Sequence, residues 1–217
     1  MKPFLILEPH VSFGWCGERP IFLDLCRDRY FALPREAEDG FRTLAEGGSL
    51  DPSSETGAAL LGTGLFARSA TPNRPKPAQT ESLAGDPIPS GQADLIVAAG
   101  IWLSLLRIHH SLRTKPFVLV LKARRRREPA VPDDLYRLRE LAGMFRAARC
   151  LVPVKPKCLP DSLALRDWLA ARAGAPDLVF GVKLHPFAAH CWVQWQGIVL
   201  NDAPDRVREF APVFVLQ

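Results

Sequence analysis

Three short stretches near the N-terminus, residues 4–8, 20–25 and 29–33, are rich in hydrophobic residues that favour β-strands. In the first stretch, hydrophobic side chains alternate between the two faces of the predicted strand, so both faces carry them. Residues 26–28, Cys-Arg-Asp, form a polar turn between the second and third stretches, which is typical of a β-hairpin. The beginning of the chain therefore predicts three strands, the last two of them paired.

A helical period follows at residues 35–46, where an apolar stripe ends at a pair of glycines. A further helix is expected around Leu60 and Leu61, continuing to Leu65 and Phe66, with a serine as its N-cap. Residues 1–69 thus predict a small module of three strands followed by short helices, with a modest core.

The rest of the chain reverses this order. Helices are predicted at residues 92–110, 116–127, 133–149 and 158–174, and strands at residues 178–184, 188–195, 198–200 and 208–216. The first of these helices is apolar on nearly all sides, so we expect it to be buried. Gln196 and Gly197 predict a tight hairpin turn between two of the strands. Residues 91–217 therefore predict helices followed by an antiparallel sheet, and the whole chain an α+β fold.

A proline-rich segment separates the two parts. Residues 70–90 hold almost no large apolar side chain, so they cannot build a core of their own. Proline also disfavours helices and sheets. We therefore expect a semi-extended linker at residues 70–90, between modules at residues 1–69 and 91–217.

Composition excludes several classes of protein. The five cysteines are odd in number and none has C-x-x-C spacing, which disfavours structural zinc and a disulfide framework. A net charge of +5 comes largely from a basic run at residues 122–127, but no aromatic residues interleave with it, so a nucleic-acid partner is disfavoured. The longest apolar run stops at Arg107, which predicts no membrane span and, without a secretory signal, a cytoplasmic protein.

Three residues near the C-terminus have the chemistry of a thiol hydrolase. Cys158 begins a predicted helix, His190 lies in a later strand, and Asp202 follows the next strand across the hairpin. A helix N-terminus favours a thiolate, and neighbouring strands can place a carboxylate beside an imidazole. The spacing therefore suggests a triad of nucleophile, base and orienting acid.

Each member also has a simpler interpretation, as a packed cysteine, a core histidine or a turn-forming aspartate. Asp161 would oppose a thiolate at Cys158 unless its carboxylate points elsewhere. His185 is a rival base, although it is expected in a loop. Cys191 is expected to face the side of the sheet opposite His190 and to serve only in packing.

The stretch from Cys158 to Asp202 resembles the B proteins of lasso peptide biosynthesis. The matching residues are Cys158, Leu159, Pro160, Ser162, Leu163, Gly181, Val182, Pro186, Phe187, His190, Trp192, Gly197, Asn201 and Asp202. The resemblance implies a transglutaminase-like, papain-related cysteine protease with Cys158, His190 and Asp202 as its catalytic triad. Cys191 departs from the pattern, because a small residue such as alanine is expected there.

The N-terminal strands are similar to the PqqD-like, winged-helix recognition elements of pathways that process ribosomally made peptides. In such elements a leader peptide adds as a strand beside the third strand and packs against the last helix. The resemblance implies leader-binding residues on that edge and helix: Arg29, Tyr30, Phe31, Ala32, Leu33, Leu65 and Phe66. Core packing is the alternative reading for the helix residues.

Together the resemblances imply a leader peptidase that frees the core peptide for macrolactam formation by an asparagine-synthetase-like cyclase. No metal or other cofactor is expected. The chain has no P-loop motif, so any ATP dependence would come through the cyclase. A transglutaminase-like acyl transferase and a non-catalytic module that delivers the precursor remain alternatives.

Overall fold

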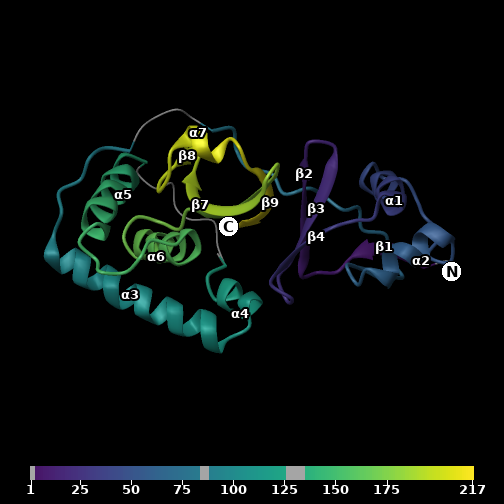
Figure 1. Ribbon diagram of the computed structural model, residues 1–217, viewed down its shortest axis with the longest axis horizontal. Helices are drawn as coiled ribbons and strands as arrows, with labels where there is room; N and C mark the ends of the chain where they lie inside the picture. The colour runs from purple at the N-terminus through teal and green to yellow at the C-terminus, as the bar shows by residue number, and fades with distance from the viewer. Residues whose placement is uncertain (1–2, 84–87, 126–134) are drawn as a thin grey trace. The chain divides into compact units, whose positions relative to one another are not determined.

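The computed structural model describes residues 3–83, 88–125 and 135–217 (Figure 1). Its contacts divide the chain into two units, one formed by Met1–Gln79 with Ala211–Phe214 and the other by Thr80–Phe210 with Val215–Gln217. Part of the proline-rich segment therefore belongs to the first unit. Within it, the Arg74 Nε donates to the carbonyl of Ala45 at 2.7 Å, and the Ala78 N–H donates to the carbonyl of Phe13 at 2.7 Å.

Five strands of the first unit form two small antiparallel sheets. They are β1 (Phe4–Leu7) paired with β5 (Phe66–Ser69), and β2 (Val11–Cys16), β3 (Arg19–Asp24) and β4 (Arg29–Ala32) in the order β2-β3-β4. The three predicted strands are present, and β2 and β5 were not anticipated. Glycine and serine interrupt the hydrophobic pattern of β2, and β5 is only four residues long, so neither carries a clear strand signal.

The predicted hairpin turn between β3 and β4 is confirmed. One carboxylate oxygen of the buried Asp24 accepts the N–H groups of Cys26 and Arg27, at 2.9 and 3.0 Å. Asp28 adopts a φ of 52°, a left-handed conformation that aspartate tolerates better than most residues. Local side-chain chemistry therefore fixes the register of this pair of strands.

Two helices, α1 (Arg35–Ala45) and α2 (Glu55–Gly62), complete the first unit. Its core contains a cluster of edge-to-face aromatic rings: Phe13, Phe22, Phe41 and Phe66. The expectation that Leu65 and Phe66 lie on the last helix is wrong. The chain leaves the helix after Gly62, Gly64 takes a positive φ, and Phe66 begins β5.

The second unit places its four longer helices before its strands, as the sequence predicts. Its helices are α3 (Leu95–Thr114), α4 (Phe117–Lys122), α5 (Leu135–Arg149), α6 (Cys158–Ala170) and the short α7 (Pro204–Val207). The strands β6 (Asp177–Leu184), β7 (Phe187–Trp195) and β8 (Ile198–Val199) form a sheet with β9 (Ala211–Leu216), in the order β8-β7-β6-β9. By its contacts, the Ala211–Phe214 part of β9 is counted with the first unit. Figure 1 shows α6 beside α3 and α5, and α6 also contacts β7. The predicted mixture of helices and antiparallel strands is confirmed.

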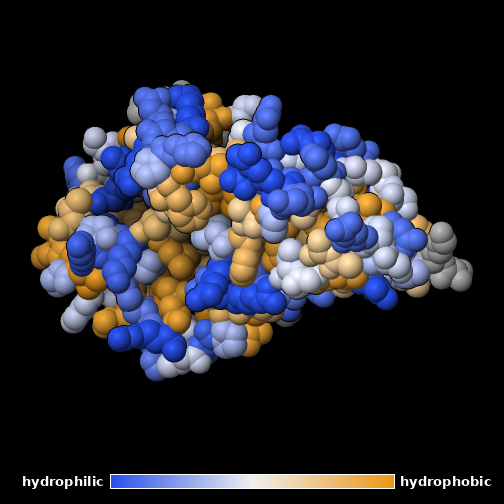
Figure 2. Space-filling model, turned by 45° about the vertical axis from the view of Figure 1, so that its right-hand side comes forward, coloured by the Kyte–Doolittle hydropathy of each residue, from blue (hydrophilic) through white to orange (hydrophobic). Residues whose placement is uncertain are grey.

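Helix α3 is less buried than its sequence predicts. Ala98, Ile101, Leu105 and Ile108 are buried, and the helix packs against α5 and α6, but Leu95 and Ile96 are 77% and 84% exposed. The expectation of burial on all sides is therefore wrong. By length and composition alone α3 could cross a membrane, although a core helix passes the same test. Hydrophobic side chains are visible between hydrophilic ones on the face of the molecule shown in Figure 2.

Candidate active site

The first turn of α6 places Cys158 at the N-terminal end of a helix. Lys157 is the N-cap residue and provides no side-chain cap. Pro160 has no N–H group, so the first-turn N–H groups open to a ligand, among the described residues, are those of Cys158 and Leu159. Helical N–H groups stabilise negative charge on a nearby sulfur or oxyanion.

His190 lies in the middle of β7, where strand pairing fixes its position. It is opposite Gly181 of β6, and it is 9% exposed. Trp192 and Phe210 pack near its ring, with centroid distances of 6.1 and 5.2 Å. The ring is therefore held in place by neighbours on the same side of the sheet.

Asp202 orients the imidazole. After β8 the chain continues beside β7, and the Asp202 Oδ2 lies 2.7 Å from the His190 Nε2. The other carboxylate oxygen accepts the N–H of Ala203 at 2.8 Å. Because Nε2 is engaged by the carboxylate, Nδ1 is the ring nitrogen left to exchange a proton with Cys158.

The three side chains perturb one another's acidity. Hydrogen bonds from Cys191 and then His190 lower the pKa of Cys158 to about 4. Hydrogen bonds with Asp202 and then Cys158 raise the pKa of His190 to about 9. Burial alone would raise the pKa of Asp202, but hydrogen bonds from His190 and Ala203 outweigh it and lower that pKa. The geometry therefore favours a thiolate–imidazolium pair at neutral pH, the activated form of a cysteine nucleophile.

Asp161 does not oppose this arrangement as strongly as its sequence position suggests. Its carboxylate is paired with Arg149 of α5, with 3.0 Å between Nε and Oδ1, and it accepts the N–H of Lys157 at 3.2 Å. An arginine partner neutralises much of its field at the thiolate. His185, the rival base, is exposed in the turn between β6 and β7.

Cys191 has a larger role than the packing that the sequence suggests. Its side chain is 2% exposed, and its thiol and backbone N–H both hydrogen-bond to Cys158. The interaction with the Cys158 thiolate, together with burial, raises the pKa of Cys191, so this thiol stays protonated and donates. The expectation that it serves only in packing is therefore wrong.

A largely buried hydrogen-bond network connects the elements that carry the triad. The Ser162 hydroxyl on α6 donates to the carbonyl of Cys191 at 3.2 Å and accepts from the Asn201 amide at 2.8 Å. The Asn201 side-chain oxygen accepts the N–H of Val193 at 2.8 Å. Sequence reasoning noted Ser162 and Asn201 within a motif without assigning them a role. Their positions, four residues after the cysteine and one before the aspartate, are the signal of that role.

Comparison with known proteins shows the family of the second unit. Residues 102–215, more than half of the chain and all three triad positions, match the transglutaminase-like superfamily. The chain belongs to this superfamily. A segment of 51 residues is 45% identical to the microcin J25-processing protein McjB of Escherichia coli, and it covers 24% of each chain. No solved structure gives a match.

The residues predicted to bind a leader peptide occupy two environments. Arg29, Tyr30, Phe31 and Ala32 form β4, which lies at the edge of its sheet and pairs with β3. Leu33 follows the strand and is buried. Leu65 and Phe66 are also buried in the core, so they can act on a ligand only through the residues that they support.

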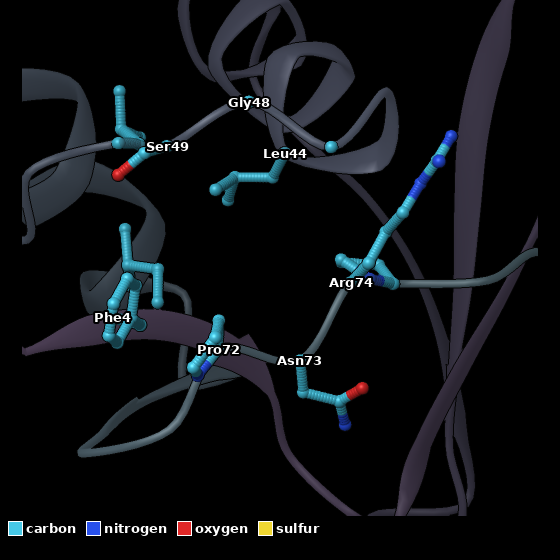
Figure 3. A pocket seen from close by; sticks show the side chains of 11 residues that line it. Phe4, Leu44, Gly48, Ser49, Pro72, Asn73 and Arg74 are labelled. Atoms are coloured by element: carbon cyan, nitrogen blue, oxygen red, sulfur yellow. The ribbon is translucent and has the colours of Figure 1, made fainter.

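A separate small cavity of about 160 Å³ lies elsewhere in the first unit (Figure 3). Phe4, Leu44 and Pro72 line it together with the backbone around Gly48. It holds no pair of groups suited to catalysis. The only charged side chain among its lining residues is that of Arg74, whose Nε donates to a backbone carbonyl.

One group of metal-ligand type is found in the described residues. His10, Asp24 and Cys26 bring their donor atoms within 4.8 Å of one another. Asp24 already accepts two backbone N–H groups, and the Arg27 Nε lies 3.5 Å from its second oxygen. A guanidinium beside the carboxylate competes with a cation, so the arrangement is explained by the turn that it stabilises.

Proposed function

We propose that this protein is a cysteine peptidase that removes the leader from a ribosomally made lasso peptide precursor. The observation that carries the proposal is the contact of Cys158, His190 and Asp202 at the start of α6, with the thiol acidified and the imidazole made more basic. The similarity to a microcin-processing protein supports the choice of substrate.

Each triad member has one role in the proposed reaction. The Cys158 thiolate attacks the carbonyl carbon of the scissile bond, and the N–H groups at the start of α6 stabilise the oxyanion. His190 gives its proton to the departing amine, which becomes the new N-terminus of the core peptide. His190 then takes a proton from water, which hydrolyses the acyl-enzyme and releases the leader with a free carboxylate. Asp202 keeps the imidazole in the required tautomer throughout.

The first unit is proposed to hold the leader. The edge of β4, from Arg29 to Ala32, offers backbone groups to an added strand, as in PqqD-like winged-helix elements. A leader held there raises the concentration of the scissile bond near the protease. The product would pass to an asparagine-synthetase-like cyclase in the cytoplasm, and any need for ATP would come from that partner. The proposal requires no metal, nucleic acid or membrane.

Mass spectrometry of the cognate precursor tests the proposal directly. The wild-type protein should release one leader and one core fragment. The reaction is run with and without the cyclase and ATP, to show whether they increase the rate of cleavage. Cys158→Ala should release neither, and Asp202→Asn should cut about 10²- to 10⁴-fold more slowly. Cys150→Ala is the matched control, because Cys150 is an exposed cysteine whose thiol bonds to the carbonyl of Arg146 on α5.

Two outcomes would contradict the proposal, and each would favour a different function. A precursor that stays intact in every wild-type reaction, while still binding, would indicate a delivery module. A leader joined to an added amine instead of water would indicate an acyl transferase, which uses the same acyl-enzyme.

A further inference from the structure

A pocket of about 740 Å³ opens beside the nucleophile, within the second unit. Its lining comes from two helices: His109, Leu112 and Arg113 of α3, and Cys158, Leu159 and Pro160 of α6 with the preceding Lys157. This volume is within the range of small-ligand sites and is ample for a single amino-acid side chain. A peptide attacked by Cys158 would therefore have a residue close to this pocket.

Two cationic side chains line the pocket without an acidic side-chain partner among the described residues. Arg113 and Lys157 are exposed, and no acidic side chain of the described residues forms an ion pair with either. The nearest acidic residue in sequence, Asp161, is already paired with Arg149. By contrast, the charge of Arg124 in the same unit is balanced by Asp167.

The neutral form of His109 does not add to this charge. Its Nδ1 lies 2.8 Å from the carbonyl of Leu105, so Nδ1 carries the proton and donates. The neutral ring then presents only an acceptor at Nε2. With a neutral His109 ring, the positive charges that line the pocket are those of Arg113 and Lys157.

The remaining walls are apolar. Leu112 and Leu159 are half-buried and Pro160 is buried, so they offer a hydrophobic surface below the two cations. A methylene stem packs well on such a surface while its charged tip reaches the rim. Among amino-acid side chains, glutamate and aspartate combine these features with negative charge.

We propose that this pocket is a subsite for a carboxylate-bearing residue of the peptide substrate, close to the scissile bond. Arg113 and Lys157 bind the carboxylate, and Leu112 and Leu159 contact the stem. The inference rests on the proposed function only in taking the carboxylate to be part of a peptide. It adds a side-chain preference that the triad itself does not dictate.

Alkylation of Cys158 tests the charge of the pocket without any peptide. The probes are iodoacetate, which is an anion, and iodoacetamide, its neutral counterpart, and the readout is the ratio of their rates at Cys158 by mass spectrometry. We expect this ratio to fall about threefold to tenfold in Arg113→Ala and in Lys157→Ala at low salt. Arg107→Ala, an exposed arginine of the same helix that does not line the pocket, should keep the wild-type ratio.

Substrate preference is tested with precursor peptides that carry glutamate or glutamine at each position near the scissile bond. At one position the glutamate peptide should be cut with a kcat/KM about threefold to tenfold higher, and the difference should shrink in about 0.5 M salt. Arg113→Glu should reverse the preference, so that a lysine peptide is cut faster than a glutamate peptide. Each variant is compared only after its melting temperature matches that of the wild type.

The two experiments separate this inference from the proposed function. An alkylation ratio that is equal in Arg113→Ala, Lys157→Ala and Arg107→Ala would overturn the subsite, even if the precursor is cut. Equal cleavage of glutamate and glutamine peptides at every position would also overturn it. A ratio that depends on both cations, in a protein that cuts no precursor, would support the anionic subsite and reject the peptidase.

Discussion

At Cys158 and His190 the usual order of acidities is reversed. A free thiol is a weaker acid than an imidazolium, yet here the pKa of the thiol is about 4 and that of the imidazolium about 9. Between these values the proton resides on His190 and the sulfur is anionic. Two neighbours stabilise this ion pair: the Asp202 carboxylate hydrogen-bonds to the imidazolium, and the Cys191 thiol hydrogen-bonds to the thiolate.

The reversed acidities predict a broad pH range of activity. Below about pH 4 the thiolate is protonated, and above about pH 9 the imidazolium loses the proton that the leaving amine needs. We therefore expect kcat/KM for precursor cleavage to rise near pH 4, stay level through neutrality and fall near pH 9. A profile that rises only near the ordinary pKa of a free thiol would contradict the ion pair.

Cys191 gives a prediction that is specific to this chain. Its thiol is the largest contributor to the lowered pKa of Cys158, so Cys191→Ala should raise that pKa from about 4. The rate of iodoacetamide alkylation at Cys158, followed from pH 3 to pH 8, should then reach its midpoint at a higher pH. Cys191→Ser keeps a hydrogen-bond donor at this position, so its midpoint should lie between those of the wild type and Cys191→Ala. An unchanged midpoint in Cys191→Ala would contradict the role of the Cys191 thiol in lowering the pKa of Cys158.

At the scale of elements, α6, β7 and the segment after β8 are held together by few groups. Ser162 and Asn201 join all three through buried and partly buried hydrogen bonds.

Gly181 of β6, opposite His190, lets the Trp192 ring lie close to the sheet. A Cβ at position 181 would come within 2.8 Å of the ring atoms of Trp192 and 3.0 Å of the Phe210 Cβ.

Gly181→Ala should therefore damage both stability and the site. Trp192 is 1% exposed and cannot move freely, so we expect a loss of about 1–3 kcal/mol in the free energy of unfolding, measured by urea denaturation. Displacement of Trp192 should also disturb His190 and lower kcat/KM. Gly100→Ala is the control, because a Cβ there meets no atom within 4 Å, and alanine in an exposed helix should stabilise it by about 1 kcal/mol. Equal effects of both variants would contradict this account.

The second unit was the more predictable of the two from sequence. Proline in the first turn and glycine beyond the end delimit α6, and Gln196 and Gly197, with φ of 48° and 78°, form the expected hairpin turn. By contrast, β5 pairs with β1 some sixty residues away, and such long-range pairing leaves no local pattern. The exposure of α3 was missed because its apolar residues surround the helix, and composition does not say which side has neighbours.

The candidate site was predictable only in part. The triad residues could be named because the cysteine lies at a helix start, the histidine and aspartate flank a hairpin, and the stretch from Cys158 to Asp202 resembles a known family. The contact between the thiols of Cys191 and Cys158 could not be predicted. Alternation along β7 places Cys191 on the side opposite His190, but it does not show that α6 packs against that side. Nor does the spacing show that Asp161 would be paired with Arg149 of another helix.

At the scale of the whole molecule, the proposal assigns binding and chemistry to different units of one chain. The proposed leader edge, β4, belongs to the first unit, and the triad belongs to the second. A substrate that occupies both is held at a high effective concentration, which predicts a large difference between long and short substrates. This difference does not require any change in the chemistry at Cys158.

We expect a short peptide that spans only the scissile bond to be cut with a kcat/KM about 100-fold below that of the full precursor. An excess of free leader peptide should inhibit cleavage of the full precursor, because the two compete for the first unit. It should leave cleavage of the short peptide unchanged, because that peptide uses the second unit alone. Steady-state kinetics with a fluorogenic version of each substrate provides the measurement. Inhibition of both substrates would place the leader at the triad itself, and inhibition of neither would remove the first unit from recognition.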